Sequence, residues 1–224
     1  MRTTEERLHQ AYSIERLDAS TPVELFQQLA NLHVNSIHGG ILEALGPNFL
    51  ASLYQQLSKN NEVLMYAARR DSKTIGFVAG SVNVIRSLKN IGFIGMVKLA
   101  SAASANAWRP SLLKKALQTV GYFFHRTGDS VSDLAGAEAA DPARSELLAI
   151  AVAEEARGQG VGRSLVNGLE QGLQNQGGRS GYFVSANEDE IGSNAFYRAA
   201  GFTLVGQKRH HDLMLNVYKK EFEQ

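Results

Sequence analysis

The sequence predicts an α/β (α+β) protein in which a mixed central sheet is flanked by helices. Short apolar runs typical of strands alternate with amphipathic segments typical of helices, and one such strand enters a glycine-rich loop from which a helix leaves. The chain has 224 residues, 44% of them hydrophobic, which is ordinary for a globular protein and enough for one large domain. We therefore expect a single domain over residues 1–224.

In the first half of the chain, prolines and polar residues mark the ends of the predicted elements. Pro22 and Pro47 each stand where a helix is expected to begin, because proline suits the first helical turn. The polar segment 70–73 separates two apolar runs and predicts the turn of a hairpin. The predicted elements are, in order, a strand at 12–17, helices at 22–33 and 47–57, and strands at 63–68 and 74–80.

The second half begins with a segment that interrupts this order. Residues 86–130 contain two stretches of helical character, at 91–105 and 111–125, and we interpret the segment as a helical insertion within the single domain. Residues 128–144 are rich in Gly, Ala, Asp and Ser, which predicts a mobile loop. The elements predicted after it are a strand at 147–152, a helix at 161–176, a strand at 182–184 and two strands within 204–222.

The loop from Arg157 to Ser164 is the most informative part of the chain. Its three glycines let the backbone approach a ligand closely. The free N–H groups at the start of the following helix, and the positive end of its dipole, favour a phosphate. Arg157 and Arg163 add positive charge to the same loop. The loop therefore predicts a binding site for a diphosphate.

Two common phosphate-binding loops do not fit its spacing. In a P-loop, the first glycine would fall on Arg157. In a dinucleotide-binding loop, the last glycine would fall on Leu165 or Arg163. The loop therefore belongs to neither of these two classes.

The spacing that does fit is Arg157-x-x-Gly160-x-Gly162, after a strand that ends in Ala-Val. This pattern resembles the acetyl-CoA loop of the GNAT N-acetyltransferases. Residues 194–202 resemble a second motif of that family, N-x-x-A-x-x-F-Y-x-x-x-G-F in a compact form, and follow the loop at the usual distance. The order of helices and strands over 12–85 also resembles the family, although less specifically.

The resemblance implies the GNAT acyl-CoA N-acyltransferase fold, and the transfer of an acetyl group from acetyl-CoA to a primary amine. The backbone N–H groups of residues 150–152 would stabilise the thioester oxygen as it gains negative charge. The residues that the resemblance places against acetyl-CoA are Ile150, Ala151, Val152, Arg157, Gly158, Gln159, Gly160, Val161, Gly162, Arg163, Ser164, Asn187, Asn194 and Tyr197.

Two side chains are candidates for proton transfer. Tyr197 stands where the family often keeps a tyrosine that protonates the departing thiolate, and its alternative role is in the core. Glu146, at the start of the central strand, is by position the best carboxylate to accept a proton from the amine, and its alternative is a solvated charge. A water chain is the alternative route for the proton of a weakly basic amine. Asn187 and Asn194 have an alternative role as caps of local turns.

The acceptor is the least determined part of the interpretation. The segment 33–54 resembles a GNAT subgroup associated with amine acetylation of bacterial surface polysaccharides or nucleotide sugars, so we expect an amino sugar or another small amine. His33 and His38 are candidate acceptor contacts, with a purely structural role as the alternative. We expect the insertion at 86–130 to shape the acceptor pocket or the contact of a homodimer. The alternatives are acetylation of a protein N-terminus or lysine, and an acyl-CoA-binding module without turnover.

The composition excludes several other classes of function. A net charge of +1 gives no bulk field for nucleic acid or a membrane surface, and no cysteine is available for a disulfide, a thiolate nucleophile or a metal site. His210 and His211 are too few ligands for a metal, so we expect none. Residues 1–7 are charged and lack the apolar core of a signal peptide, and 91–108 is too polar for stable membrane insertion, so we expect a cytoplasmic protein.

Overall fold

The computed structural model describes residues 12–37, 45–89, 144–177, 180–210 and 213–222. His38, most of the expected insertion at 86–130 and nearly all of the loop expected at 128–144 lie outside these ranges.

The described residues form one mixed sheet, as the sequence predicts. Seven strands are hydrogen-bonded in the order β1-β2-β3-β4-β5-β7-β6. Only β4 and β5, among these seven, run parallel to each other, and every other neighbouring pair is antiparallel. The strands are β1 Ser13–Leu17, β2 Val63–Arg70, β3 Lys73–Ser81, β4 Glu146–Val152, β5 Gly181–Asn187, β6 Thr203–His210 and β7 Leu213–Glu221.

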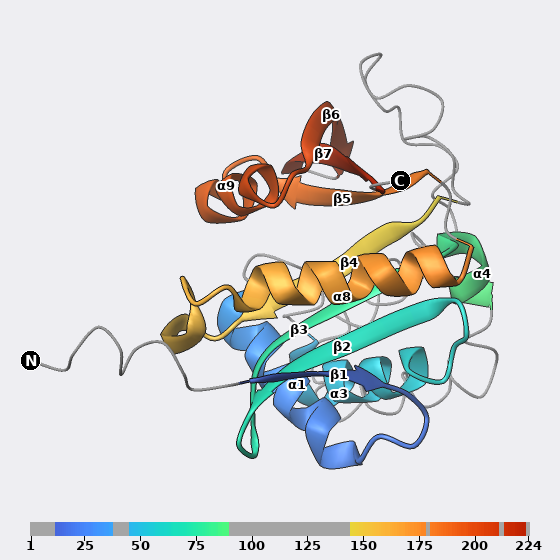
Figure 1. The fold of residues 1–224 in the computed structure, drawn as a ribbon, viewed down its shortest axis with the longest axis vertical. Helices are drawn as coiled ribbons and strands as arrows, with labels where there is room; N and C mark the ends of the chain where they lie inside the picture. Colours follow the sequence, from blue (N-terminus) through green and yellow to red (C-terminus); the bar gives the residue numbers. More distant parts are fainter. Residues whose placement is uncertain (1–11, 38–44, 90–143, 178–179, 211–212, 223–224) are drawn as a thin grey trace, which may run out of the picture.

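Helices cover both faces of this sheet (Figure 1). α1 and α3 pack on one face, and α8 packs on the other, mainly over β2 and β3. α9 lies beside β5, in a group with β6 and β7 that stands apart from the first four strands in the view. The helices are α1 Val23–Ser36, α3 Gly46–Leu57, α4 Val84–Lys89, α8 Val161–Asn175 and α9 Ile191–Ala199.

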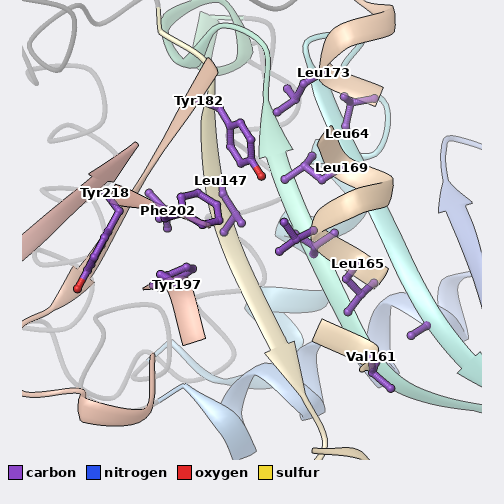
Figure 2. Close-up of a cluster of buried hydrophobic side chains, with 14 of the residues drawn as sticks. Leu64, Leu147, Val161, Leu165, Leu169, Leu173, Tyr182, Tyr197, Phe202 and Tyr218 are labelled. Carbon is purple, nitrogen blue, oxygen red and sulfur yellow. The ribbon is translucent and has the colours of Figure 1, made fainter. Parts of the chain in front are cut away.

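The core has one layer on each face of the sheet. The layer under α8 contains Leu165, Leu169 and Leu173, all fully buried, and continues to the aromatic side chains of β5, α9 and β7 (Figure 2). Full burial of each leucine stabilises the fold by roughly 1.5–3 kcal/mol. Gly80 lets the helix come close to the sheet, because a Cβ on that residue would lie 2.6 Å from Leu169. The other layer lies between the sheet and the helices α1 and α3.

Candidate active site

The central strand β4 is irregular in its first half. Ala79 of β3 pairs with Ala149, but the next residue, Gly80, pairs with Leu147, so Leu148 is an extra residue in β4. Such a bulge turns the strand and changes the direction of the backbone groups that follow. The bulge therefore comes just before the residues whose N–H groups are the expected donors to the thioester oxygen.

Beyond this bulge, β4 separates from its parallel neighbour. Among the described residues the two strands pair at one position, Glu146 with Phe183, where the Phe183 N–H donates to Ser145 at 3.0 Å. Residues 148–150 of β4 remain partly exposed, although β4 is the middle strand of seven. A central strand that is open on one edge leaves space for a ligand to lie along it.

The backbone of β4 directs two amides toward this open edge. The Ala153 N–H donates to Ile75 of β3 at 2.9 Å, and Ala151 is in register with Phe77 of β3. Because N–H groups alternate in direction along an antiparallel strand, those of Ile150 and Val152 point away from β3, toward β5. The expected set of three donors thus divides: Ile150 and Val152 face the open edge, whereas Ala151 faces β3.

The glycine-rich loop joins this strand to α8 and leaves the start of the helix open. The Ser164 N–H donates to the Gly160 carbonyl at 3.0 Å, which is the first bond of the helix, and no side chain caps its N-terminus. The amides of residues 160–163 therefore have no partner within the helix. Gly158 and Gly160 adopt φ values of +73° and +81°, which only glycine reaches without strain.

Three arginines surround this helix start. Arg157 donates to the Val152 carbonyl at 3.3 Å and Arg163 donates to the Ala199 carbonyl at 2.9 Å. Arg70 comes from β2 and donates to the side chain of Gln159 at 2.6 Å. Within the described part of the chain, none of the three pairs with a carboxylate. The unpaired charges and the free amides together suit an anion of high charge.

Other contacts fix the loop against its neighbours. Ser164 shares a hydrogen bond of 2.9 Å with the Tyr12 hydroxyl, so its own hydroxyl is already held within the protein. Gly162 brings α8 close to α9, because a Cβ there would lie 2.9 Å from the ring of Phe196. The start of α8 is thus anchored to the residue before the first strand on one side and to α9 on the other.

Tyr197 lies on α9 among aromatic side chains (Figure 2). Its ring contacts Phe196, Phe202 and Tyr218, with centroids 5.4–5.8 Å apart. Burial raises the pKa of its phenol above the usual value, and the phenol of Tyr218 raises it further. The hydroxyl is therefore protonated at neutral pH. Its ring belongs to the core, and no described group hydrogen-bonds to its hydroxyl.

Asn194 is the centre of a buried hydrogen-bond network. Its amide nitrogen donates to the carbonyls of residues 187, 188 and 190, at 2.8–3.2 Å. Its oxygen accepts from Asn216 and from the Tyr218 hydroxyl, both at 2.8 Å. The side chain of Asn187 accepts from the amide of Asp189 at 3.2 Å. Both asparagines thus organise the turn from β5 into α9.

Glu146 lies at the point where β4 and β5 separate. Its side chain is only 7% exposed, and Arg144 lies 3.5 Å away with its guanidinium over the ring of Phe183. Leu147 packs under α8, so Glu146 points to the opposite face of the sheet. The expected alternative of a solvated charge does not describe this buried carboxylate.

Two serine hydroxyls near Glu146 have no hydrogen-bond partner among the described residues. Ser81 is the cross-strand neighbour of Glu146 on β3, and Ser185 follows Phe183 by two residues on β5. Both therefore share the face of Glu146. Their hydroxyl oxygens are fully buried and unbonded. A buried polar group without a partner costs about 1–3 kcal/mol, which a ligand recovers only if neighbouring side chains move to let it reach the hydroxyl.

His33 is a buried residue of α1. Its Nδ1 lies 2.6 Å from the Tyr54 hydroxyl, and its ring stacks on Phe77 of β3. It is only 3% exposed, so the structure places it within the layer under α1 and α3.

A pocket of about 470 Å³ lies near the far end of α8 and includes Gln176, Gly177 and Asn83. It adjoins neither the loop at 157–160 nor the open edge of β4, so we do not assign the chemistry to it. No group of His, Asp and Glu in the described ranges could hold a metal ion. Among the same residues, no helix has the length and apolar character that crossing a membrane requires.

Comparison with known proteins decides the family. Residues 41–202, which contain the open strand, the loop and α9, match the acetyltransferase (GNAT) family. The chain belongs to this family. No curated protein sequence matches the chain.

Several solved structures share the fold at low sequence identity. SsHAT is 13% identical with a TM-score of 0.61, over 96% of this chain and all of that one. The PaiA N-acetyltransferase from Thermoplasma acidophilum, in complex with coenzyme A, is 13% identical with a TM-score of 0.54, over 95% and 99%. The ribosomal-protein-S18-alanine N-acetyltransferase from Escherichia coli is 12% identical with a TM-score of 0.53, over 96% of each chain.

As a GNAT N-acetyltransferase, the protein uses acetyl-CoA as its co-substrate. The residues present fit this molecule, because free amides and unpaired arginines at α8 suit its diphosphate and the open edge of β4 suits its extended arm. Arg70, Tyr12, Ser81 and Ser185 were not predicted as part of this region. Each lies far from the family motifs in the sequence or carries no local pattern that marks it.

Proposed function

We propose that this GNAT acetyltransferase moves the acetyl group of acetyl-CoA to the primary amine of a small hydroxylated molecule, such as an amino sugar. The observation that carries the cofactor part of the proposal is the opening of β4 beside an uncapped α8. One end of that opening offers amides and arginines for phosphate, and the other end holds Glu146.

In this proposal the diphosphate lies on the amides of residues 158–163, near Arg157 and Arg163. The pantetheine arm follows the open edge of β4. The amides of Ile150 and Val152 are the donors available to the thioester oxygen, and removal of one such donor typically costs about 10²–10³ in rate. Asn187 and Asn194 act by fixing the β5–α9 turn beside this arm.

We assign the protonation of the departing thiolate to Tyr197. The amine nitrogen attacks the thioester carbon, the carbon–sulfur bond breaks, and the sulfur takes the phenolic proton. The raised pKa supports the first requirement of this role, because the phenol keeps its proton at neutral pH. It also makes the phenolate left by this transfer unfavourable, so Tyr197 must regain a proton, and the proton that Glu146 takes from the amine balances the turnover.

We assign Glu146 as the group that accepts the proton of the amine. Its position at the closed end of the opening supports this role, because the acetyl group must lie near that end when the diphosphate is at α8. Arg144 keeps the carboxylate oriented. A carboxylate that is almost fully enclosed admits an amine only through a narrow approach, which favours a small acceptor over a folded protein surface.

The unbonded hydroxyls of Ser81 and Ser185 support a hydroxylated acceptor. They lie on the same face as Glu146, on the two strands that flank β4. A sugar presents hydroxyl groups that both donate and accept hydrogen bonds, so it can satisfy both serines once neighbouring side chains move to admit it. An aliphatic lysine side chain would leave both unsatisfied, at a cost of about 1–3 kcal/mol each.

Release of the CoA thiol, measured with a thiol reagent, tests the proposal. The chain contains no cysteine, so the signal reports the co-substrate alone. We expect turnover with members of a panel of amino sugars and nucleotide amino sugars, and a lower kcat/KM for those acceptors in the Ser185→Ala variant. Turnover with peptide N-termini or lysines only would contradict the acceptor class. Binding of acetyl-CoA without turnover of any amine would contradict the assigned catalysis.

A further inference from the structure

Arg70 makes a contact with the cofactor loop that joins distant parts of the chain. Its Nη2 donates to Oε1 of Gln159 at 2.6 Å, across 89 positions in the sequence. Nε2 of Gln159 donates in turn to the backbone carbonyl of Glu155, also at 2.6 Å. Gln159 is therefore held at both ends of its amide group, by the β2–β3 hairpin and by the turn at the end of β4.

The position of Gln159 makes this contact important for the loop. It stands between Gly158 and Gly160, which both adopt left-handed φ values. Glycine loses more conformational freedom on ordering than any other residue, so a loop with this sequence is costly to hold in one conformation. Gln159 lies between the two glycines, so a single hydrogen bond to its side chain restricts the backbone of both.

The positive charge of Arg70 is not neutralised by a carboxylate among the described residues. Within the described residues it forms no ion pair, and its Nε is buried without a partner. Its neighbour Arg69 is different, because it lies 3.7 Å from the carboxylate of Glu15 and donates to the Ser72 carbonyl. Of these two adjacent arginines, only Arg70 contacts the cofactor loop.

We propose that Arg70 is a positioning residue for the cofactor loop, which acts through Gln159. It holds the loop in the conformation that directs the amides of residues 158–163 to the diphosphate of acetyl-CoA before that molecule binds. This rests on the proposed function, in which the diphosphate lies on this loop. The role is binding by preorganisation, so it acts on affinity for the co-substrate and not on the chemical step.

The test compares Arg70→Ala with the matched control Arg69→Ala. Because the hydrogen bond from Arg70 to Gln159 is exposed to solvent, we expect Arg70→Ala to weaken binding by about fivefold. Calorimetry should show this loss equally with CoA and with dephospho-CoA, because both carry the diphosphate. In turnover, KM for acetyl-CoA should rise with kcat unchanged, and S-acetylpantetheine, which lacks the diphosphate, should be unaffected. Arg69→Ala should behave as the wild type.

Gln159→Ala provides a second route to the same result. It should reproduce the loss, and the double variant should be no weaker than Arg70→Ala alone, because both residues act through one link. Binding within twofold of the wild type in both single variants would overturn the proposal. A loss with CoA but not with dephospho-CoA would also overturn it, since Arg70 would then contact the 3′-phosphate directly. A fall in kcat at constant KM would likewise overturn it and place Arg70 in the chemical step.

Backbone ¹⁵N relaxation without any ligand separates this proposal from the proposed function. Order parameters of the amides of residues 158–163 should be lower in Arg70→Ala than in Arg69→Ala, whatever the co-substrate does. Equal order parameters in the two variants would overturn the positioning role. Failure of the wild type to bind CoA would instead contradict the proposed function, and would leave the relaxation result to decide the role of Arg70.

Discussion

Substitution of Gly160 by aspartate is the perturbation for which the structure makes the sharpest prediction. Gly160 has φ +81°, and a Cβ on it would lie 3.8 Å from the Tyr12 hydroxyl, with no other heavy atom within 4 Å. There is room for a side chain, so the cost is that of backbone strain, about 1–2 kcal/mol. A carboxylate at a helix N-terminus recovers about 0.3–1 kcal/mol of this through the dipole. We expect the variant to fold.

The effect on binding is larger than the effect on folding. At a separation of about 5 Å, two unit charges repel by roughly 0.8 kcal/mol at the dielectric constant of water, and by about 3 kcal/mol at an effective value of 20. The new carboxylate also competes for the amides that the diphosphate needs. Because each 1.4 kcal/mol is about tenfold in affinity, we expect CoA to bind about tenfold to a hundredfold more weakly.

Gly177→Asp is the matched control. Gly177 has φ +72°, a Cβ on it would have no atom within 4 Å, and it follows the opposite end of α8. It therefore introduces similar strain and the same charge away from the loop. Calorimetry should show normal CoA affinity for Gly177→Asp, and circular dichroism should show that both variants are folded. If folded Gly160→Asp bound CoA within twofold of the control, the diphosphate would not lie on this loop.

Four further predictions concern the side chains of the site. Tyr197→Phe should lower kcat by about 10²–10⁴ with little change in acetyl-CoA affinity. The control Tyr182→Phe, in the same core layer, should leave kcat unchanged. An effect on KM alone would make Tyr197 a packing residue. Because burial raises the pKa of Tyr197, its titration should add no inflection to the rate profile of the wild type between about pH 6 and 9, and a wild-type inflection there that Tyr197→Phe removes would refute this. Glu146→Gln should lose most activity at low pH, where the amine is protonated, and a profile parallel to that of the wild type would remove Glu146 as the base. Asn194→Ala should lower the free energy of unfolding by roughly 3 kcal/mol, because it leaves several buried groups unpaired, and a loss below about 1 kcal/mol in urea unfolding would show that the network is not needed.

The sequence predicted the elements that local patterns determine. Alternating or continuous apolar runs located the strands, and Pro22 and Pro47 located the first two helices within a residue or two. The loop at 157–164 was predicted in place because its glycines, strand and helix are adjacent in the sequence. The structure at such residues is determined by about ten neighbouring positions in the sequence.

Features that depend on distant pairing could not be predicted in the same way. Ala151 faces β3 while Ile150 faces the open edge, and this depends on the register with β3 across the bulge at Leu148. The side chain of Asn194 is hydrogen-bonded to groups from β5 and β7. Arg70 reaches Gln159 only because the β2–β3 hairpin folds back beside the loop. These contacts follow from the tertiary arrangement, which no local pattern encodes.

Amide chemical shifts of the isotope-labelled protein, titrated with CoA, test the central claim most directly. The account predicts the largest changes at the amides of Ile150 and Val152 and at residues 158–163, with little change at Ala151 and none around Asn83 and Gln176. Changes concentrated in the pocket near Asn83 and Gln176, with the loop and the open edge of β4 unaffected, would contradict it.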